Sequence, residues 1–481
     1  MGIIFVPVYL KYLGTETYGL IGVFMSLQVI FSVLDGGLGS ALTKEIAQRS
    51  SYPAVKENKI GDLVKTLGTI YWMVAVIAGV FAILISPLLA GYWVKPVNLT
   101  YYDVVEVFIL LSMSLIFLLP SGFYSGGLIG LQKHLTLNIL KVIFALVKNG
   151  GAVVVLIFSS EKLITFFTWN LIVNALQSLV FKMTLWKYIG KERVKAKFNW
   201  QEFASVRKYA LGITRINITA LILTQVDRIV LSKILPLNQF GCYTLAGSIA
   251  VFIYQIIQPI NQSFFPRFAA LTGSSDKNEL RQVYQLAYQV VSLLIIPAFL
   301  ILAFFSEELL YLVTSDVTLT QSTKIILSVL AVANGLNSLL NIPYQLSLAY
   351  GWTKYSFYQN ILLIITLTPL TIYLSLHYSA LGGAVSWLIL NIIILITGSI
   401  IIHKRLIRDE ILKWYMYGLS LPLVLNTGLV WIFREISGWD MTNKFLTIII
   451  VFSFGIICLT FNSILLPEIR KRIIGFKLYR Q

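Results

Sequence analysis

The sequence predicts an all-α polytopic membrane protein, and three observations carry this prediction. The chain has 481 residues, of which 57% are hydrophobic and only 12% are charged, and its mean hydropathy is +0.80. A soluble protein of this size could not bury so much apolar surface, because apolar residues would also have to cover its exterior. The apolar residues also fall into runs of about 20 or more, the length that crosses a bilayer as a helix.

Thirteen apolar runs are long enough to cross a membrane, and Met1–Leu13 resembles the second half of a further span. We therefore expect about 14 transmembrane helices, of which the first is incomplete. Several runs exceed 25 residues, which implies tilt or extension beyond the hydrocarbon. The expected spans cover 18–47, 64–94, 104–130, 136–158, 162–187, 206–235, 241–271, 283–313, 322–349, 355–377, 380–403, 411–434 and 445–467.

The basic residues gather on one side of these spans. Alternating sides along the chain place 28 of the 38 Lys and Arg residues on one side and seven on the other, while Lys148, Arg215 and Arg228 fall within spans. By the positive-inside rule, the richer loops and both termini are cytoplasmic. The net charge of +17 then forms a rim that meets anionic phospholipids, and nucleic acid is not an expected partner.

An internal repeat divides most of the chain into two halves. Three sets of residues recur: Gly19 with Gly241 at an offset of 222, Lys133 with Lys354 at 221, and Trp169 with Trp387 at 218, the last followed by Asn174 with Asn391 at 217. We expect two pseudo-symmetric six-helix lobes in the same orientation, as in transporters built from parallel repeats. The expected parts are an N-terminal lobe at 1–190 with a truncated first helix, a basic cytoplasmic linker at 191–205, a C-terminal lobe at 206–405, and two additional helices with a basic cytoplasmic tail at 406–481.

Lys148 lies at the centre of the fifth expected span, with no acidic residue nearby in the sequence. A lone ammonium at the bilayer centre costs at least about 2.5 kcal/mol even on permissive insertion scales, so it requires a wet cavity or an anionic partner. Helical geometry places Asn138, Lys141, Ala145, Lys148 and Ala152 within roughly 80° of one another. This stripe predicts a cavity for an anionic substrate, and snorkelling of Lys148 to an interface is the alternative.

A second polar stripe lies on the seventh expected span. Its members are Thr214, Asn217, Leu221, Thr224 and Arg228, with Gln225 at the border. Arg228 is the stronger cavity residue, whereas Arg215 either lines the cavity or snorkels. Asp227 either pairs with a basic group of a neighbouring helix or takes part in coupling and in neutralising a counter-charge.

Asp35 lies near mid-membrane in the glycine-rich segment Leu34–Gly39. Glycines expose backbone polar groups, which is tolerated only where protein or water satisfies them. We expect either a hinge or cavity-lining position, or simple helix packing. No metal site, nucleotide loop or cofactor is indicated, and coupling to protons, sodium ions or the membrane potential stays open.

Short motifs follow one another along the chain up to about residue 410. They are Tyr12-Leu13-Gly14 with Tyr18-Gly19, Leu34–Gly39, Gly130-Leu131-Gln132 with Asn138, Trp200 with Phe203, Thr224–Arg228, Phe240-Gly241, and Pro343–Leu346 with Gly351–Lys354. In order and spacing they resemble the bacterial oligosaccharide (O-antigen) flippases, a family of the multidrug/oligosaccharidyl-lipid/polysaccharide exporter superfamily.

The resemblance implies a central cationic cavity between two lobes that opens alternately to either face of the bacterial inner membrane. Its substrate would be an undecaprenyl-pyrophosphate-linked oligosaccharide, moved from the cytoplasmic to the periplasmic leaflet, and its partners would include other membrane proteins of glycan assembly. Lys148 and Arg228 would neutralise the pyrophosphate. The residues that would hydrogen-bond sugar or phosphate oxygens are Asn138, Asn217, Thr224 and Gln225.

One departure concerns the first helix, because family members begin with a complete one and about half of it is missing here before Val6. A misassigned start codon or a fragment would account for this.

Two other functions remain open. A drug or cation exporter of the same superfamily should line its cavity with acids, whereas the central membrane here has Lys148 against Asp35. A membrane polysaccharide polymerase or ligase would need a sizeable periplasmic loop with catalytic groups, but Ser306–Lys324 has three acids and no His or Arg. We therefore expect a transporter and not an enzyme.

Overall fold

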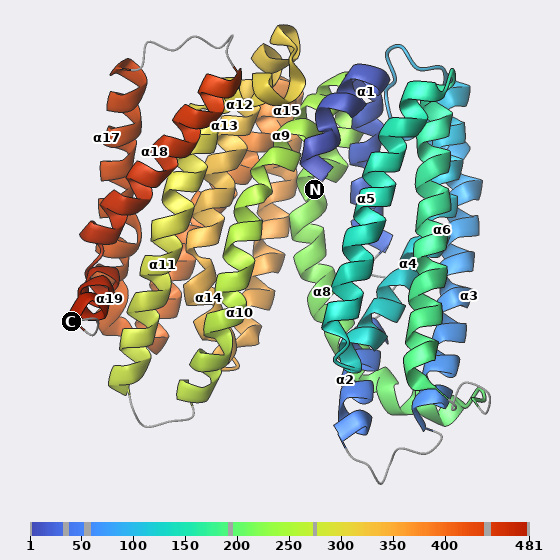
Figure 1. The fold of residues 1–481 in the computed structure, drawn as a ribbon, viewed down its shortest axis with the longest axis horizontal. Coiled ribbons are helices and arrows are strands. Elements are labelled where there is room, and N and C mark those ends of the chain that lie inside the picture. The colour runs from blue at the N-terminus through green and yellow to red at the C-terminus, as the bar shows by residue number, and fades with distance from the viewer. Residues whose placement is uncertain are drawn as a thin grey trace. The chain divides into compact units, whose positions relative to one another are not determined.

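The computed structural model describes residues 2–31, 38–51, 59–190, 196–272, 277–436 and 444–478, which are helical almost throughout (Figure 1). Within these ranges no β-strand forms, and the one β-bridge joins Lys95 to Pro236. The predicted all-α fold is confirmed.

The chain packs as two compact units, Met1–Gly241 and Cys242–Gln481. The first unit contains α1 (Gly2–Phe31), α2 (Leu38–Ser51), α3 (Lys59–Leu88) with a π-helical end (Leu89–Trp93), α4 (Tyr101–Gly130), α5 (His134–Phe158), α6 (Lys162–Ile189) and α8 (Trp200–Ile234). Helix α9 (Leu237–Ala250) runs across the boundary. The second unit contains α10 (Phe252–Thr272), α11 (Lys277–Phe304), α12 (Ser306–Thr314), α13 (Val317–Leu339), α14 (Asn341–Ala349), α15 (Thr353–Leu406), α16 (Ile411–Lys413), the π-helix η5 (Trp414–Ser420), α17 (Leu421–Ile436), α18 (Lys444–Leu465) and α19 (Pro467–Leu478).

The boundary between the units lies after α8, whereas the repeat in the sequence places a lobe boundary before it, at residue 206. Helix α8 packs against α1, α2 and α3. Near its start, Glu202 forms an ion pair with Arg49 of α2 at 2.7 Å. Packing therefore groups α8 with the first unit, and the division into lobes at residue 206 stays a prediction about topology.

Nine of the described helices are long and apolar enough to cross a membrane. One of the long helices contains two expected spans, because α15 has 54 residues and breaks at Ser379 (φ 53°, ψ −134°), between the spans expected at 355–377 and 380–403. Helix α1 likewise breaks at Gly14 (φ 76°, ψ 171°), where the expected half-span ends. About 14 crossings are compatible with these helices.

The two units repeat one packing scheme. In the first unit, α4 packs against α2, α3 and α6; in the second, α13 and α14 pack against α10, α11 and α15. The partners follow one another in the same order along the chain. This doubled arrangement is the one expected from the sequence offsets.

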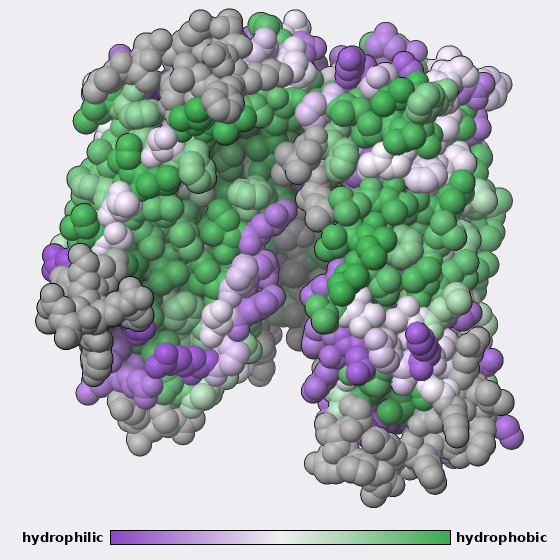
Figure 2. Space-filling view, in the orientation of Figure 1, coloured by the Kyte–Doolittle hydropathy of each residue, from purple (hydrophilic) through white to green (hydrophobic). Residues whose placement is uncertain are grey.

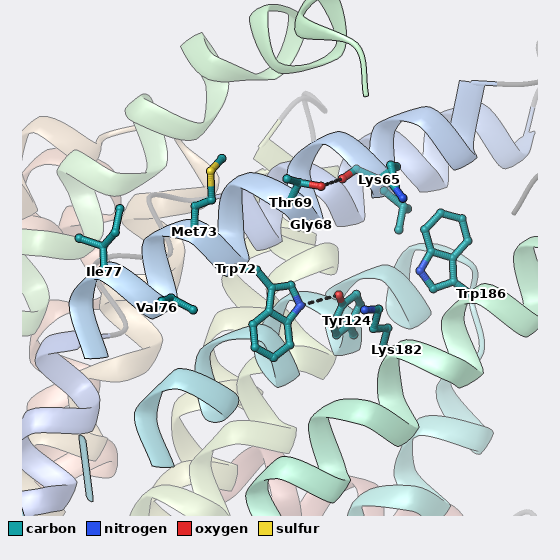
Figure 3. A pocket seen from close by; sticks show the side chains of 11 residues that line it. Lys65, Gly68, Thr69, Trp72, Met73, Val76, Ile77, Tyr124, Lys182 and Trp186 are labelled. Atoms are coloured by element: carbon teal, nitrogen blue, oxygen red, sulfur yellow. Dashed lines mark hydrogen bonds between the residues drawn. The ribbon is translucent and has the colours of Figure 1, made fainter. Parts of the chain in front are cut away.

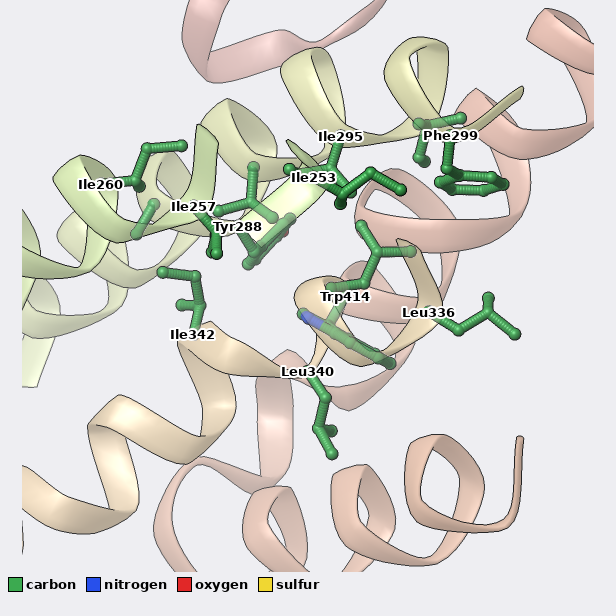
Figure 4. Packing of buried hydrophobic residues seen from close by; sticks show 14 of the residues in the cluster. Ile253, Ile257, Ile260, Tyr288, Ile295, Phe299, Leu336, Leu340, Ile342 and Trp414 are labelled. Atoms are coloured by element: carbon green, nitrogen blue, oxygen red, sulfur yellow. The ribbon is translucent and has the colours of Figure 1, made fainter. Parts of the chain in front are cut away.

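The additional C-terminal helices are integral to the second unit. Helices α17, α18 and η5 pack against α11, and Trp414 of η5 is buried in a core with Tyr288, Ile295 and Phe299 (Figure 4). Asn426 of α17 and Asn462 of α18 are fully buried and donate to each other's side-chain oxygens at 2.8 and 3.1 Å. Each amide thereby satisfies the other inside an apolar environment.

Large apolar side chains cover much of the exposed surface of each unit (Figure 2). On α3, Ile77 and Leu84 are 70% and 71% exposed, and on α15, Ile365 and Leu376 are 65% and 64% exposed. Exposed apolar surface of this extent is stable in hydrocarbon and not in water. The arrangement is that of a multi-pass membrane protein.

Gly19 of α1 and Gly241 of α9 bring two backbones into direct contact within the first unit. A Cβ atom at Gly241 would lie 2.1 Å from Thr15 O, and one at Gly19 would lie 2.3 Å from Leu237 O. Only glycine permits so close a crossing. These are the two glycines that the sequence repeat pairs at an offset of 222 residues.

Gly241→Ala is therefore expected to destabilise the protein by about 1–3 kcal/mol, because the added methyl group meets backbone that cannot rotate away. Thermal unfolding in detergent measures this effect. Gly122→Ala is the control, since a Cβ there meets no atom within 4 Å and the exchange should be neutral or stabilising. Equal midpoints for the two variants would contradict the close crossing.

Candidate functional site

The side chain of Lys148, midway along α5, turns toward the neighbouring helices. Its Nζ donates to Asn174 Oδ1 of α6 at 3.2 Å, and Asn174 Nδ2 donates to Ser114 Oγ of α4 at 2.5 Å. Asn174 and Ser114 are only 1% and 2% exposed. A chain of hydrogen bonds thus joins the amine to the interior of three packed helices.

The hydrogen-bond partner of the Lys148 amine is neutral. No ion pair involves Lys148 among the residues with described side chains, and the side chain is half-buried. The amide oxygen accepts from one of the three N–H donors of the ammonium and leaves its charge uncompensated. The network therefore presents a net positive charge within a membrane span.

Contacts from α1 and α6 fix the rotation of α5 around Lys148. Trp169 Nε1 of α6 donates to Lys148 O at 3.2 Å, and Tyr9 OH of α1 donates to Asn149 Oδ1 at 3.1 Å. Trp169 approaches this closely because residue 151 is glycine: a Cβ there would lie 2.2 Å from its Cζ2 atom. The indole and the amine are thus positioned by the same turn of α5.

The predicted stripe on α5 changes its environment along the helix. Asn138 and Lys141 are exposed, Lys148 is half-buried, and Ala152 is fully buried. Asn138 lies ten residues from Lys148, which is about 15 Å along a helix. The stripe therefore leads from an exposed end to the buried network, and Asn138 is too distant to contact the same group as Lys148.

On α8 the predicted residues differ in how far their side chains are exposed. Thr224 is exposed and Arg228, one turn later, is half-buried; within the described structure the guanidinium of Arg228 has no hydrogen bond or ion pair. Gln225 and Asp227 are buried, at 7% and 8% exposed, and they flank the face of Thr224 and Arg228 on opposite sides because they are two residues apart in the helix. Gln225 Oε1 is buried without a hydrogen-bond partner in the described part of the chain, so it does not share the accessible face of Thr224.

Three predicted residues cannot be placed in this way. Asp35 lies outside the described residues, and so do the side chains of Arg215 and Asn217, whose backbone is part of α8. The roles expected for all nine site residues stay predictions.

Ser114, Asn174 and Trp169 were not predicted as partners of Lys148. Trp169 and Asn174 stand out in the sequence only as members of the repeat. The signal that the sequence offered was Asn174 itself, an amide side chain at the centre of an apolar span. Such a group in hydrocarbon requires a partner on another helix.

The second unit contains a neutral version of this network. Trp387 Nε1 donates to Asn334 Oδ1 at 2.9 Å, and Asn337 Nδ2 donates to Asn391 Oδ1 at 2.7 Å. The repeat offsets of 217 to 222 place the equivalent of Lys148 at residues 365–370, none of which is charged. The two units thus share a Trp–Asn arrangement, and the cation belongs to the first alone.

Helix α10 carries a polar stripe that was also not predicted. Gln255, Gln258 and Gln262 are exposed at spacings of three and four residues, within the apolar span Leu237–Thr272, and a hydrophilic line follows α10 in Figure 2. Carboxamides offer both donors and acceptors without charge. Such a stripe suits a ligand with many hydroxyl groups.

The doubled helix arrangement and the intramembrane polar networks define a multi-pass carrier fold of the multidrug/oligosaccharidyl-lipid/polysaccharide exporter (MOP) superfamily. The lipid II flippase MurJ, solved in an inward closed conformation, shares this fold with a TM-score of 0.76 and 15% identity, covering 96% of this chain and 95% of that chain. An inward-facing multidrug resistance MATE family transporter of the MOP superfamily has a TM-score of 0.72 and 15% identity, covering 84% and 93%.

At the level of sequence, a family described as polysaccharide biosynthesis protein matches residues 11–319, and the chain belongs to this family. Lipopolysaccharide biosynthesis protein WzxC of Escherichia coli (strain K12) is 24% identical over 438 residues, which cover 88% of this chain and 83% of that protein. The predicted membership in a polysaccharide flippase family of this superfamily is confirmed.

Gly151→Ala is expected to displace Trp169 from Lys148 O and to lower stability by about 1–3 kcal/mol through overpacking. Gly150→Ala is the matched control, because a Cβ at Gly150 meets no atom within 4 Å. Thermal unfolding of both variants in detergent tests this difference. A destabilisation that is the same at both positions would show that the indole does not need the space at residue 151.

Proposed function

We propose that this protein is a lipid-linked oligosaccharide flippase. It moves an undecaprenyl-pyrophosphate-linked glycan repeat unit from the cytoplasmic to the periplasmic leaflet of the bacterial inner membrane by alternating access, with both termini in the cytoplasm. The observation that carries this proposal is the intramembrane amine of Lys148, whose side chain bonds the neutral Asn174. A pyrophosphate supplies the negative charge and the acceptor oxygens that this amine lacks.

Membership in a polysaccharide biosynthesis family supports a substrate drawn from glycan assembly. Among the proteins of similar sequence or fold, WzxC is a protein of lipopolysaccharide biosynthesis and MurJ is a flippase of lipid II. A lipid-linked sugar combines an anionic group, a hydroxyl-rich head and a hydrocarbon tail. The cationic network matches the anionic group, and the membrane itself matches the hydrocarbon tail.

Binding would proceed by exchange of hydrogen-bond partners. The anion replaces Asn174 as the acceptor for Lys148, because an ammonium bonds a phosphate oxygen more strongly than it bonds a neutral amide. Arg228 supplies a second cation. Hydrogen bonds to sugar or phosphate oxygens come from the polar residues Asn138, Asn217 and Thr224.

The energy source is proposed to be a proton, a sodium ion or the membrane potential. Outward movement of one negative charge gains about 2.3 kcal/mol per 100 mV when the cytoplasm is negative. Asp35, Asp227 and Arg215 are the charged groups proposed to serve coupling or to have structural roles.

Lys148→Ala is expected to lower flipping at least about 100-fold, which corresponds to roughly 3 kcal/mol for the loss of one partner of a buried charged contact. Lys148→Arg should retain part of the activity because it keeps the charge. The measurement is transfer of a lipid-linked oligosaccharide across proteoliposomes, with surface glycan in the host as a second readout. Lys187→Ala is the control, since Lys187 is exposed near the end of α6.

Full activity of Lys148→Ala would show that Lys148 does not neutralise the charge of the substrate. The same vesicles test the rival function: uptake of a cationic dye by the wild-type protein, with no transfer of the lipid-linked sugar, would identify a cation exporter instead.

Asn174→Asp provides a test that preserves the shape of the network. The new carboxylate should pair with Lys148, so the protein stays folded while the free positive charge disappears and flipping falls at least tenfold. Asn391→Asp in the second unit is the matched variant: Asn391 is 1% exposed and bonds the neutral Asn337, so its carboxylate should lower the thermal midpoint. Normal flipping by Asn174→Asp would contradict the proposal.

A further inference from the structure

A separate cavity of about 650 Å³ lies in the first unit between α3, α4 and α6 (Figure 3). No residue of the Lys148 network lines it. Lys65, Lys182 and Trp186 gather at one end, and Met73, Val76 and Ile77 lie toward the other. The cavity is therefore basic at one end and apolar at the other.

The two lysines come from different helices and converge on this cavity (Figure 3). Both side chains are exposed, and neither amine takes part in an ion pair of the described residues. Both belong to the side of the membrane predicted to be cytoplasmic. Two free amines at one site attract an anionic group that bridges them.

Aromatic groups form the middle of the cavity. Trp72 Nε1 donates to Tyr124 OH at 2.9 Å, which fixes both rings, and Tyr124 is 2% exposed. The indole nitrogen of Trp186 has no hydrogen-bond partner within the described structure, and its edge is directed toward the lysines in Figure 3. It is a free donor beside the two amines, at the interfacial depth that tryptophan favours.

Helix α3 sets the order of these groups along the membrane normal. Lys65, Thr69, Trp72 and Val76 follow at spacings of three and four residues, so they share one face. From Lys65 to Ile77 the helix rises about 18 Å, from the predicted interface into the hydrocarbon. Met73 and Ile77 are 50% and 70% exposed, which leaves an open apolar path beyond the rings.

We propose that this cavity binds an anionic phospholipid of the cytoplasmic leaflet. The phosphate lies between Lys65 and Lys182, the Trp186 N–H donates to one of its oxygens, and an acyl chain follows Met73, Val76 and Ile77. A zwitterionic lipid fits less well, because no Asp or Glu lines the cavity to receive its amine. A glycan headgroup fits less well too, since the lining is mostly apolar.

Native mass spectrometry of the full chain, titrated with phosphatidylglycerol or with phosphatidylethanolamine of the same acyl chains, tests this site. Each lysine near an anionic headgroup accounts for about fivefold in affinity. Lys65→Ala combined with Lys182→Ala should therefore weaken phosphatidylglycerol binding about 25-fold and leave phosphatidylethanolamine unchanged. The doubly substituted Lys65→Arg and Lys182→Arg protein should bind as the wild type does.

Lys187→Ala combined with Lys404→Ala is the matched control, because it removes two exposed lysines of the same predicted side that do not line the cavity. An equal loss in this control, or none in the cavity variant, would overturn the proposal. If the double alanine variant does not fold, Lys65→Gln and Lys182→Gln singly should each lose about fivefold.

Lys148→Ala should bind phosphatidylglycerol normally, so this site can fail or hold independently of the flippase proposal. If undecaprenyl phosphate displaces phosphatidylglycerol from the cavity at equal concentration, the cavity belongs to the transported substrate, and the phospholipid proposal is wrong.

Discussion

The structure depends on one constraint: a polar group inside hydrocarbon must find its partner within the protein. Helices satisfy the backbone, and the side chains are satisfied by amides on neighbouring helices. Asn426 with Asn462 and Asn337 with Asn391 meet this requirement as neutral pairs. Lys148 has a hydrogen-bond partner in Asn174, but its positive charge has no counter-charge among the described side chains. This uncompensated charge distinguishes the Lys148 network of the first unit from hydrogen bonds that serve helix packing alone.

The repeat makes this distinction clear, because it provides two versions of one arrangement. Both units have a tryptophan and an asparagine on the equivalent helix, and both use them in hydrogen bonds with adjacent helices. The second unit shows that the fold does not need a cation there. Helix packing alone therefore does not account for the charge of Lys148, and this is the reason for proposing an anionic ligand.

The lengths of the apolar runs were sufficient to predict most of the helices and the breaks within α1 and α15. The expected spans meet near Gly14 and Ser379, where the backbone leaves the helical region. Lys148 could be selected as a candidate site residue because its position at the centre of an apolar span follows from the sequence of one helix. The pairing of Lys148 with Asn174 could not be, since these residues are 26 positions apart and many helix rotations are compatible with either sequence.

Contacts between helices, which the sequence does not reveal, also decide the positions of residues on α8 and in the cavity between α3, α4 and α6. Helical periodicity assigned Gln225 to the border of a polar face, but contacts with other helices bury it. Lys65 and Lys182 are each unremarkable interfacial lysines in the sequence. Only the packing of α3 and α6 against α4 brings them to one cavity.

The neutral partner of Lys148 has a consequence for turnover. A carrier has to release its cargo and then return empty, and a bare ammonium in hydrocarbon would make that return slow. In the proposed mechanism, Asn174 accepts the hydrogen bond of the amine once the cargo leaves, and this bond is weak enough to yield to the next anion. A carboxylate at that position would compete too well with the cargo, and an aliphatic residue would strand the unloaded state.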